Sequence, residues 1–218
     1  MSEYTISETA GRSEWRLNGK LHNEDGPAVV YADGCKEWRL NGKLHRVDGP
    51  AIEWADGSKF WYRNGKLHRI DGPAMEDADG TKEWYRNGKL HRVDGPAIEY
   101  SWGTNEWYQN GKLHRVDGPA MEEADGAKKW YLNDKRHRVD GPAVEYPDGH
   151  KEYWVNGKQH REDGPAMEAK HGKLWAINGE IHREDGPAVE FTNGDKQWYV
   201  KGVRMTEEEF NKRLTVSQ

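Results

Sequence analysis

The chain has 218 residues, of which 34% are hydrophobic and 25 are glycine, and its mean hydropathy is −1.15. This composition excludes a thick apolar core, although 11 Trp and 10 Tyr residues can build a thin one because each ring buries a large area. The formal charge of −5 comes from 38 acidic and 33 basic residues mixed at short range, and the lack of a basic stripe argues against nucleic acid as a partner.

The N-terminal segment, MSEYTISETAGRSEW, is polar and acidic, and no stretch of the sequence approaches 18 apolar residues. The single cysteine, Cys35, cannot form an internal disulfide. We therefore expect a cytoplasmic protein, or one of the host cytoplasm if a phage encodes it, and no membrane partner.

One eleven-residue phrase, NGKLHRVDGPA, recurs along the chain with small changes. Successive copies are 23 residues apart except for one spacing of 22. A fixed period of this size indicates a repeat architecture in which each unit contacts chiefly its neighbours. The residues that open the copies are Asn18, Asn41, Asn64, Asn87, Asn110, Asn133, Asn156 and Asn178.

Each copy predicts two antiparallel strands and two turns. Asn-Gly between an aromatic segment and Lys-Leu-His is typical of a two-residue hairpin, in which both turn residues need a positive φ. A second turn, usually Asp-Gly, separates the PAIEW-like run from the SKFWY-like run. Joined in series, the hairpins predict a sheet with Asn-Gly turns along one edge and Asp-Gly turns along the other. Strand alternation predicts one apolar face, to which Ile52 and Trp54 belong, and one charged face.

The two ends of the chain differ from the repeats. Residues 1–17 predict an N-terminal half repeat that serves as a cap, and residues 18–204 hold eight repeats plus a degenerate last turn. Residues 205–218 predict a capping helix that covers the last open strand.

Inside that helix, Thr206 and Glu209 have the spacing of a capping box. Phe210 and Leu214 lie at positions i and i+4, which share one helical face. We therefore expect both side chains to pack on the last strand.

The 23-residue period, the aromatic strand before Asn-Gly, the His four residues after that Asn and the later Asp-Gly turn together resemble the MORN (membrane occupation and recognition nexus) repeat. The resemblance covers about residues 12–204 and is closest to bacterial and phage MORN-like variants, including an antitoxin-like group. It implies an all-β repeat fold, in which about eight 23-residue β-hairpin repeats form an elongated, curved, single-layer antiparallel sheet. It also implies a binding role such as scaffolding or dimerisation.

This chain departs from the family pattern after the His. Arg replaces the glycine that usually follows, and DGPA replaces a glycine-spaced strand. We therefore expect the segment from His to Ala to leave the sheet as a small loop.

His and Asp recur as a His-x-x-Asp unit, which raises the question of a metal site or an acid–base pair. Two strands per repeat separate equivalent side chains by about 9.6 Å, because neighbouring strands lie about 4.8 Å apart. Zinc ligands lie about 2 Å from their ion, so successive His residues cannot share one. We favour a structural role, in which Asp accepts backbone N–H bonds in its own turn and His bonds a neighbour. Contact with a partner stays open.

The Arg after each His has two interpretations. A row of arginines could bind an acidic partner, or each Arg could pair with Asp or Glu, which we favour. In the Gly-Pro-Ala that follows, we expect Gly to allow an unusual φ, Pro to fix the next φ and Ala to leave room for a Trp.

Three irregular copies could carry specific function or reflect drift. Trp102 replaces the turn Asp in one copy, Asn-Asp-Lys-Arg replaces Asn-Gly-Lys-Leu around Arg136, and one residue is lost around Lys170 and His171. The candidate partner-binding residues are His45, Arg46, Asp48, His68, Arg69, Asp71, His91, Arg92, Asp94, His114, Arg115, Asp117, Trp102, Arg136, Lys170 and His171.

We therefore expect a non-enzymatic scaffold that binds another protein through its sheet or through the edge formed by the His-Arg-x-Asp units. The resemblance suggests an inhibitor or antitoxin-like partner of phage or bacterial origin. The alternative is sequestration of a small anionic ligand, such as a nucleotide, by Arg and aromatic side chains. An enzyme is disfavoured because eight equivalent units give no single asymmetric site. A homodimer stays open, and no cofactor is expected.

Overall fold

The computed structural model describes residues 4–9 and 11–216. Residues 1–3 of the expected N-terminal half repeat and residues 217–218 of the expected helical segment lie outside the described part. The chain is mostly β: antiparallel hairpins follow one another at a regular spacing of about 23 residues, and one short helix closes the C-terminal end. The expected fold class is confirmed in these terms.

The chain divides into two compact units, unit 1 (residues 1–112) and unit 2 (residues 113–218). In each unit, the strands on either side of the Asp-Gly turns pair antiparallel into a wide sheet. In unit 1 these strands are β1 (Tyr4–Thr9), β2 (Arg12–Leu17), β4 (Val29–Tyr31), β5 (Lys36–Glu37), β8 (Ile52–Glu53), β9 (Lys59–Phe60), β12 (Met75–Glu76), β13 (Lys82–Glu83), β16 (Ile98–Glu99) and β17 (Asn105–Glu106). In unit 2 they are β20 (Met121–Glu122), β21 (Lys128–Lys129), β24 (Val144–Glu145), β25 (Lys151–Glu152), β28 (Met167–Ala169), β29 (Gly172–Leu174), β32 (Val189–Phe191) and β33 (Lys196–Val200). β33 also pairs with β34 (Val203–Met205) across Lys201-Gly202, the degenerate last copy of the Asn-Gly turn.

The residues on either side of each Asn-Gly turn form a second set of short strands, so each full repeat has four strands where two were expected. The expected long strand is interrupted at the Trp. The N–H of Trp61 donates to the carbonyl of Ala74 in the next repeat (2.8 Å), whereas its own carbonyl accepts from His68 (2.9 Å). The chain thus exchanges pairing partners at this residue. The hairpin strands are β3 (Lys20–Leu21), β6 (Arg39–Leu40), β7 (Lys43–Leu44), β10 (Tyr62–Arg63), β11 (Lys66–Leu67), β14 (Tyr85–Arg86), β15 (Lys89–Leu90), β18 (Tyr108–Gln109), β19 (Lys112–Leu113), β22 (Tyr131–Leu132), β23 (Lys135–Arg136), β26 (Trp154–Val155), β27 (Lys158–Gln159), β30 (Ala176–Ile177) and β31 (Glu180–Ile181).

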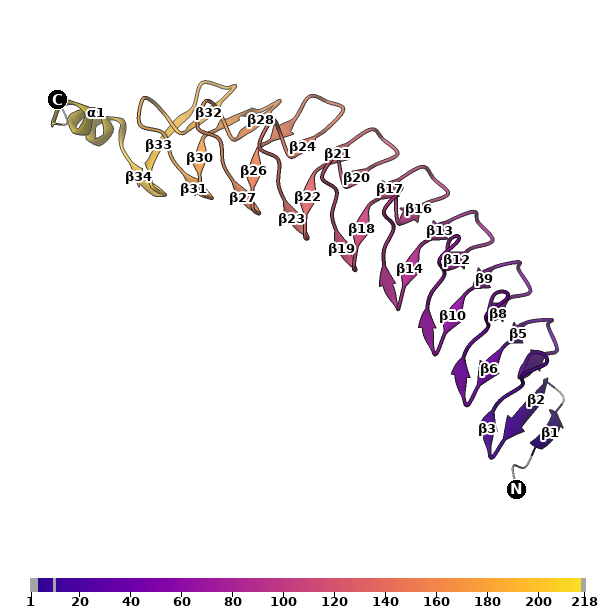
Figure 1. Ribbon diagram of the computed structural model, residues 1–218. Coiled ribbons are helices and arrows are strands. Elements are labelled where there is room, and N and C mark those ends of the chain that lie inside the picture. Colours follow the sequence, from indigo (N-terminus) through magenta and orange to yellow (C-terminus); the bar gives the residue numbers. More distant parts are fainter. Residues whose placement is uncertain (1–3, 10, 217–218) are drawn as a thin grey trace. The chain divides into compact units, whose positions relative to one another are not determined.

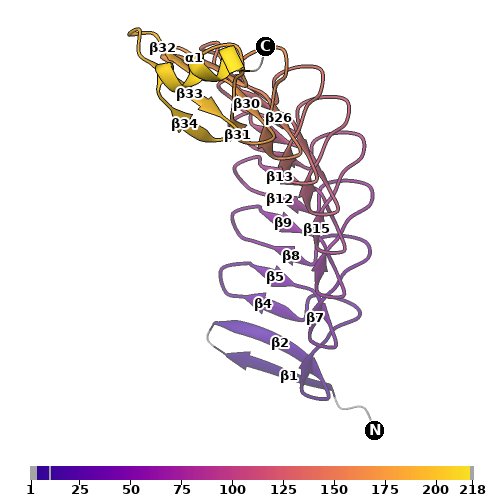
Figure 2. The same cartoon turned by 90° about the vertical axis from the view of Figure 1, so that its left-hand side faces the viewer.

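The turn chemistry read from the sequence is confirmed. Asn64 has a φ of 53° and Gly65 a φ of 78°, as a type I′ hairpin requires. Figure 1 shows the Asn-Gly hairpins of unit 1 in file along one side of its strands. In Figure 2 the Asp-Gly turns of unit 1 project on one side of the wide sheet, and the segments from His to Ala project on the other as loops. The expectation that DGPA leaves the sheet is therefore correct.

The apolar core differs from the expected single apolar face. The Ala of Gly-Pro-Ala is the most deeply buried residue of a repeat; Ala51, for example, has no exposed surface, whereas Trp54, expected on the apolar face, is half exposed. Ala51 is held between two backbones, because it donates to Phe60 (2.8 Å) and accepts from Trp38 (2.8 Å). The apolar core of each repeat thus lies where the Ala at the end of the projecting loop meets the Trp and the wide sheet.

On the wide sheet, charged side chains of opposite sign face one another across the strands. Glu53 of β8 lies opposite Lys36 of β5 on one side and Lys59 of β9 on the other. Opposite charges at directly facing positions stabilise a sheet and fix its register.

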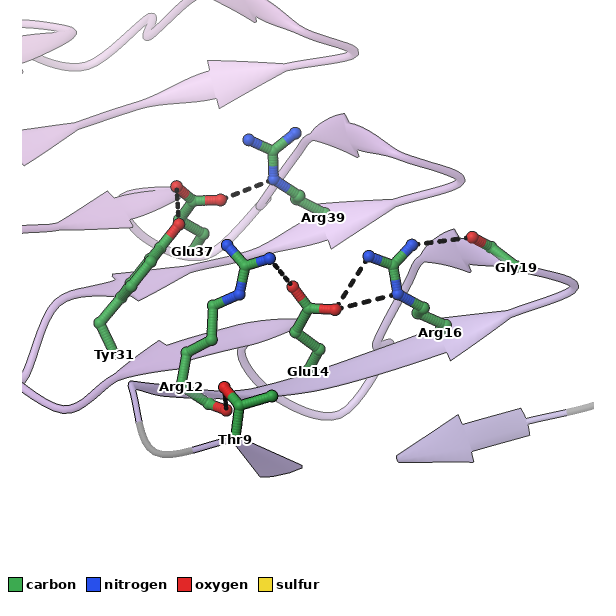
Figure 3. Close-up of polar contacts among 8 residues, drawn as sticks. All are labelled: Thr9, Arg12, Glu14, Arg16, Gly19, Tyr31, Glu37 and Arg39. Carbon is green, nitrogen blue, oxygen red and sulfur yellow. Dashed lines mark hydrogen bonds and ion pairs between the residues drawn. The ribbon is translucent and has the colours of Figure 1, made fainter. Parts of the chain in front are cut away.

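At the N-terminal end, β1 pairs with β2 over six residues. Glu14 of β2 is buried, and Figure 3 shows it between Arg12 (2.7 Å) and Arg16 (2.8 Å). The two guanidinium groups offset the cost of burying the carboxylate.

At the C-terminal end, α1 (Glu207–Val216) begins with the expected capping box. Glu209 Oε2 accepts from the N–H of Thr206 (2.8 Å), and Thr206 Oγ1 accepts from the N–H of Glu209 (3.2 Å). Phe210 is buried as expected, but Leu214 remains 44% exposed, so the expectation that both side chains pack on the last strand holds for Phe210 alone. The described residues contain no helix with the length and apolarity needed to cross a membrane.

Candidate functional site

In every repeat after the first, where Asn23 replaces Arg, the structure places the His, Arg and Asp together in the projecting loop, and we call the row of these loops within a unit the loop edge. It consists of residues 45–51, 68–74 and 91–97 in unit 1, and of residues 114–120, 137–143, 160–166 and 182–188 in unit 2. The geometry of each loop follows from two linked interactions, one made by His and one made by Arg.

The His side chain connects each loop to the hairpin of the next repeat. In unit 1, Nδ1 of His68 accepts from the backbone N–H of Asn87 (3.1 Å), and Nδ1 of His91 accepts from that of Asn110 (3.1 Å). A ring nitrogen that accepts this bond carries no proton, so the neutral ring bears its proton on Nε2. This confirms the expectation that His bonds a neighbour.

One irregular copy lacks this link. The Asn133-Asp134 turn places Asp134 at a φ of 66°, and its Oδ1 accepts from the N–H of Leu113 (2.9 Å). Nδ1 of His114 is buried without a hydrogen-bond partner. Replacing Gly by Asp therefore substitutes one inter-repeat hydrogen bond for another.

The Arg side chain is satisfied inside its own repeat. The guanidinium of Arg92 lies 4.0 Å from the ring centroid of Trp84. It donates to the Pro96 carbonyl (3.1 Å), to Glu99 (2.7 Å) and to Asp94 (3.3 Å). The stacking combines a cation–π interaction with burial of the indole face.

The other arginines repeat this arrangement. Arg46, Arg69 and Arg138 stack on Trp rings at 4.1 Å, Arg183 does so at 4.0 Å, and Arg161 stacks on Tyr153 at 4.0 Å. Arg115 bonds Asp117 (3.1 Å) and the carbonyl of Pro119 (3.2 Å). These contacts correspond to the structural pairing favoured from the sequence.

Two details of the loop correct the sequence interpretation. Gly95 has no positive φ; instead, a Cβ at this position would lie 2.8 Å from Cζ of Arg92, so the missing side chain makes room for the guanidinium. The Asp carboxylate has Arg as its main partner instead of the backbone of its own turn. The hydrogen bond from Arg138 is the largest cause that holds the pKa of Asp140 below its usual range, and Arg161 does the same for Asp163.

The sequence interpretation missed the aliphatic side chain between Arg and Asp. In five loops this residue is Val or Ile, and its side chain is largely in solvent. The five residues are Val47 (77% exposed), Ile70 (69%), Val93 (76%), Val116 (82%) and Val139 (81%). A branched aliphatic residue between two charged residues of an expected loop was the available signal, because neither a strand nor a turn requires it there.

Cavities lie between consecutive loops of the same unit. In unit 1, one of about 310 Å³ lies between Val47 and Ile70, and one of about 520 Å³ between Ile70 and Val93. In unit 2, the cavities of about 600 Å³ and about 790 Å³ share Val139 as a wall. Each cavity is also lined by the Trp or Tyr, the His and the Asp of its repeat.

The remaining candidates lie away from the loop edge. Trp102 belongs to the turn between β16 and β17, where it stacks on Tyr100 at 4.3 Å. Lys170 and His171 form the turn between β28 and β29. Arg136 lies in β23 and pairs with Glu152 (3.0 Å). The structure thus brings the His-Arg-Asp sets together but leaves these four residues apart from them.

Cys35 occupies a structural position. Its Sγ accepts from the N–H of Ala55 (3.4 Å), just as Oγ of Ser58 accepts from Ala78 one repeat later (3.0 Å). The Ala55 bond favours the thiolate, yet burial and the nearby Asp33 together raise the pKa of the thiol. A cysteine that acts as a nucleophile needs a lowered thiol pKa instead. Among residues 4–9 and 11–216, no group of three or more His, Cys, Asp or Glu side chains could hold a metal ion.

These features define a repeat protein built of β-hairpins, in which the loops of each unit project at one edge of that unit. No family model matches the chain, and no curated protein matches it.

Proposed function

We propose that the chain is a divergent MORN-like scaffold that binds another protein through its loop edge. The observation that carries this proposal is the row of exposed Val and Ile side chains, each next to a cavity between consecutive loops. The fold gains nothing from aliphatic groups in water, whereas a partner that covers them removes apolar area from solvent. An inhibitor or antitoxin-like role is the setting that the MORN-like resemblance suggests.

The alternative of binding a small anion through the arginines has less support. Each Arg of the loop edge already pairs with an Asp and a Glu, and Arg92, for example, contacts Asp94, Glu99 and the ring of Trp84. An anion would have to displace two carboxylates from every loop-edge Arg it used.

Affinity capture from an extract of the cells that make the protein, with mass spectrometry of the captured material, tests the proposal. We expect a stoichiometric protein partner that is lost when Val116 and Val139 are both replaced by Ser. Val203→Ser is the matched control, because Val203 is also an exposed valine (62%) but lies in β34. A partner retained by the double variant, or no partner at all, would contradict the proposal.

A further inference from the structure

The cavities of the loop edge recur at a spacing that restricts which backbone conformation can fill them. Each repeat adds two strands to the wide sheet, and strands lie about 4.8 Å apart, so equivalent points advance by about 9.6 Å per repeat. A ligand that places equivalent groups in consecutive cavities must therefore return to the same face after about this distance.

Three regular conformations can be compared with that distance. A β-strand presents the same face every two residues, or about 6.7 Å. An α-helix returns to nearly the same face after seven residues, or about 10.5 Å. A polyproline II helix returns after three residues, or about 9.3 Å. Over the two steps that join three loops, the mismatch is about 0.6 Å for polyproline II and about 1.8 Å for the α-helix.

The walls of the cavities suit such a ligand chemically. Proline-rich segments dock on aromatic-lined grooves, and their backbone carbonyls are free to accept hydrogen bonds. In unit 2, the cavity between Val116 and Val139 is lined by the ring of Trp130 and by His137. Nδ1 of His137 accepts from the N–H of Asn156 (3.1 Å), so Nε2 carries the proton of the neutral ring and can donate to a ligand carbonyl.

The charge of the loop edge selects a basic ligand. In each of these loops one Arg is bound by an Asp and a Glu, and the Asp is the most exposed of the three groups, so the loop presents a carboxylate to solvent. In unit 2, Glu162 and Glu184 replace the aliphatic residue and each add another carboxylate. In unit 1, Arg63 and Arg86 line the cavities and offset this charge. The cavities of unit 2 are therefore the more acidic.

The acidic groups are also accessible. The side chain of Asp140 is 86% exposed and that of Asp163 is 85% exposed, although each bonds an Arg. Each carboxylate can therefore accept from a second cation that approaches from solvent.

From spacing, wall chemistry and charge, we infer that the loop edge of unit 2 binds a basic, proline-rich segment in the polyproline II conformation, with one residue triplet per repeat. Prolines occupy the space between Val116 and Val139, and the basic residue of each triplet pairs with Asp117 or Asp140. The inference rests on the proposed function, because it specifies the partner of the same surface.

The probe is a fluorescein-labelled peptide of four Pro-Pro-Arg triplets, titrated against the full chain by fluorescence anisotropy. Two peptides serve as controls: eight prolines followed by four arginines, which keep composition and charge but lose the period, and four Pro-Pro-Glu triplets. We expect the periodic basic peptide to bind at least tenfold more tightly than either control.

Variants then locate the site. We expect Val116→Ser with Val139→Ser to weaken binding of the periodic peptide about tenfold, and Val203→Ser to leave it unchanged. Asp117→Asn with Asp140→Asn should weaken binding and reduce its dependence on salt, because two charge contacts are lost. All these side chains are exposed, so circular dichroism should show unchanged folding.

Equal binding of the periodic and the grouped peptide, or binding that survives the Val double replacement, would overturn the inference. If a captured protein partner depends on Val116 and Val139 but is not displaced by excess Pro-Pro-Arg peptide, the proposed function stands and the polyproline II ligand does not. If the peptide displaces the partner, both are supported.

Discussion

Gly95 tests the packing of the loop. Replacing it with Ala adds a Cβ 2.8 Å from Cζ and 3.0 Å from Nε of Arg92, so the guanidinium must move. The backbone itself accepts Ala, because Gly95 has no positive φ. The effect of Gly95→Ala therefore depends on whether Arg92 is present.

The contacts of Arg92 determine how much Gly95→Ala changes the free energy of unfolding. Stacking on Trp84 is worth about 1 kcal/mol for a partly buried cation–π pair, and the hydrogen bond to the Pro96 carbonyl about 1.5 kcal/mol for a charged donor. The pairs with Asp94 and Glu99 add about 0.5 kcal/mol each, because both are partly solvated. A displaced Arg recovers some of this total, and Ala restricts the unfolded chain by about 0.4–1 kcal/mol. We expect Gly95→Ala to lower the free energy of unfolding by about 1–2 kcal/mol.

The assay is a double-mutant cycle by urea unfolding, with Gly95→Ala measured in wild type and in Arg92→Ala. Without Arg92, the added Cβ meets no guanidinium, so Gly95→Ala should stabilise by about 0.4–1 kcal/mol. The chain supplies its own control at Gly26, where Asn23 replaces Arg and a Cβ would lie at an ordinary 3.4 Å from Nδ2. Gly26→Ala should be neutral or slightly stabilising. An equal cost of Gly95→Ala in both backgrounds would refute the reasoning.

Three further predictions concern other parts of the chain. Asp134→Ala should lower the free energy of unfolding by about 1–2 kcal/mol, because it loses the bond to Leu113 and keeps a strained φ. Asp134→Gly also loses the bond but relieves the strain, so it should be nearly neutral in thermal unfolding. Equal losses for the two variants would contradict this. Arg contacts lower the folded-state pKa of Asp117, Asp140, Asp163 and Asp185, so their stabilisation is present above the unfolded pKa of about 3.9 and is lost as pH falls through the folded values. The melting temperature of Asp140→Asn should therefore fall less than that of wild type between pH 5 and about pH 2.5, a range set by these pKa values, and an identical fall would count against the Arg–Asp pair. Phe210→Ala should cost about 3 kcal/mol locally and expose the amides of α1 and β33 to hydrogen exchange, whereas Leu214→Ala should change protection little; equal effects would contradict the observed packing.

The local turn chemistry was predictable because it depends on neighbouring residues. Asn64-Gly65 requires positive φ at two consecutive positions, and few residue pairs other than Asn-Gly accept this. The Thr206 to Glu209 capping box is likewise a property of four residues. The 23-residue period also made the sheet predictable, since similar hairpins joined in series pair with their neighbours.

The interior of the loop was not predictable from these local rules. Gly95 provides space for a guanidinium and does not supply a special φ. This role depends on the placement of Arg92 over Trp84. The strand break at Trp61 depends on Ala74 of the next repeat. Alternation also misjudged Trp54, because the deepest burial falls on the loop Ala instead of on one face of the strands. These are tertiary effects. The exposure of Val and Ile in the loop was likewise not predicted, because it depends on how the loop projects from the sheet.

The single shortened repeat indicates how the array can change without losing its interaction surface. The lost residue belongs to the turn between β28 and β29, yet Asn178 still donates to His160 at 3.1 Å, the distance between Asn156 and His137 one repeat earlier. Changes in chain length are thus absorbed at the Asp-Gly turns, while the spacing of the loops is preserved. A reporter or protease site inserted between Lys170 and His171 would leave the cavities in place, and duplication of a 23-residue cassette would add one more. Gene duplication can therefore change the number of loops, while the spacing between consecutive loops stays the same.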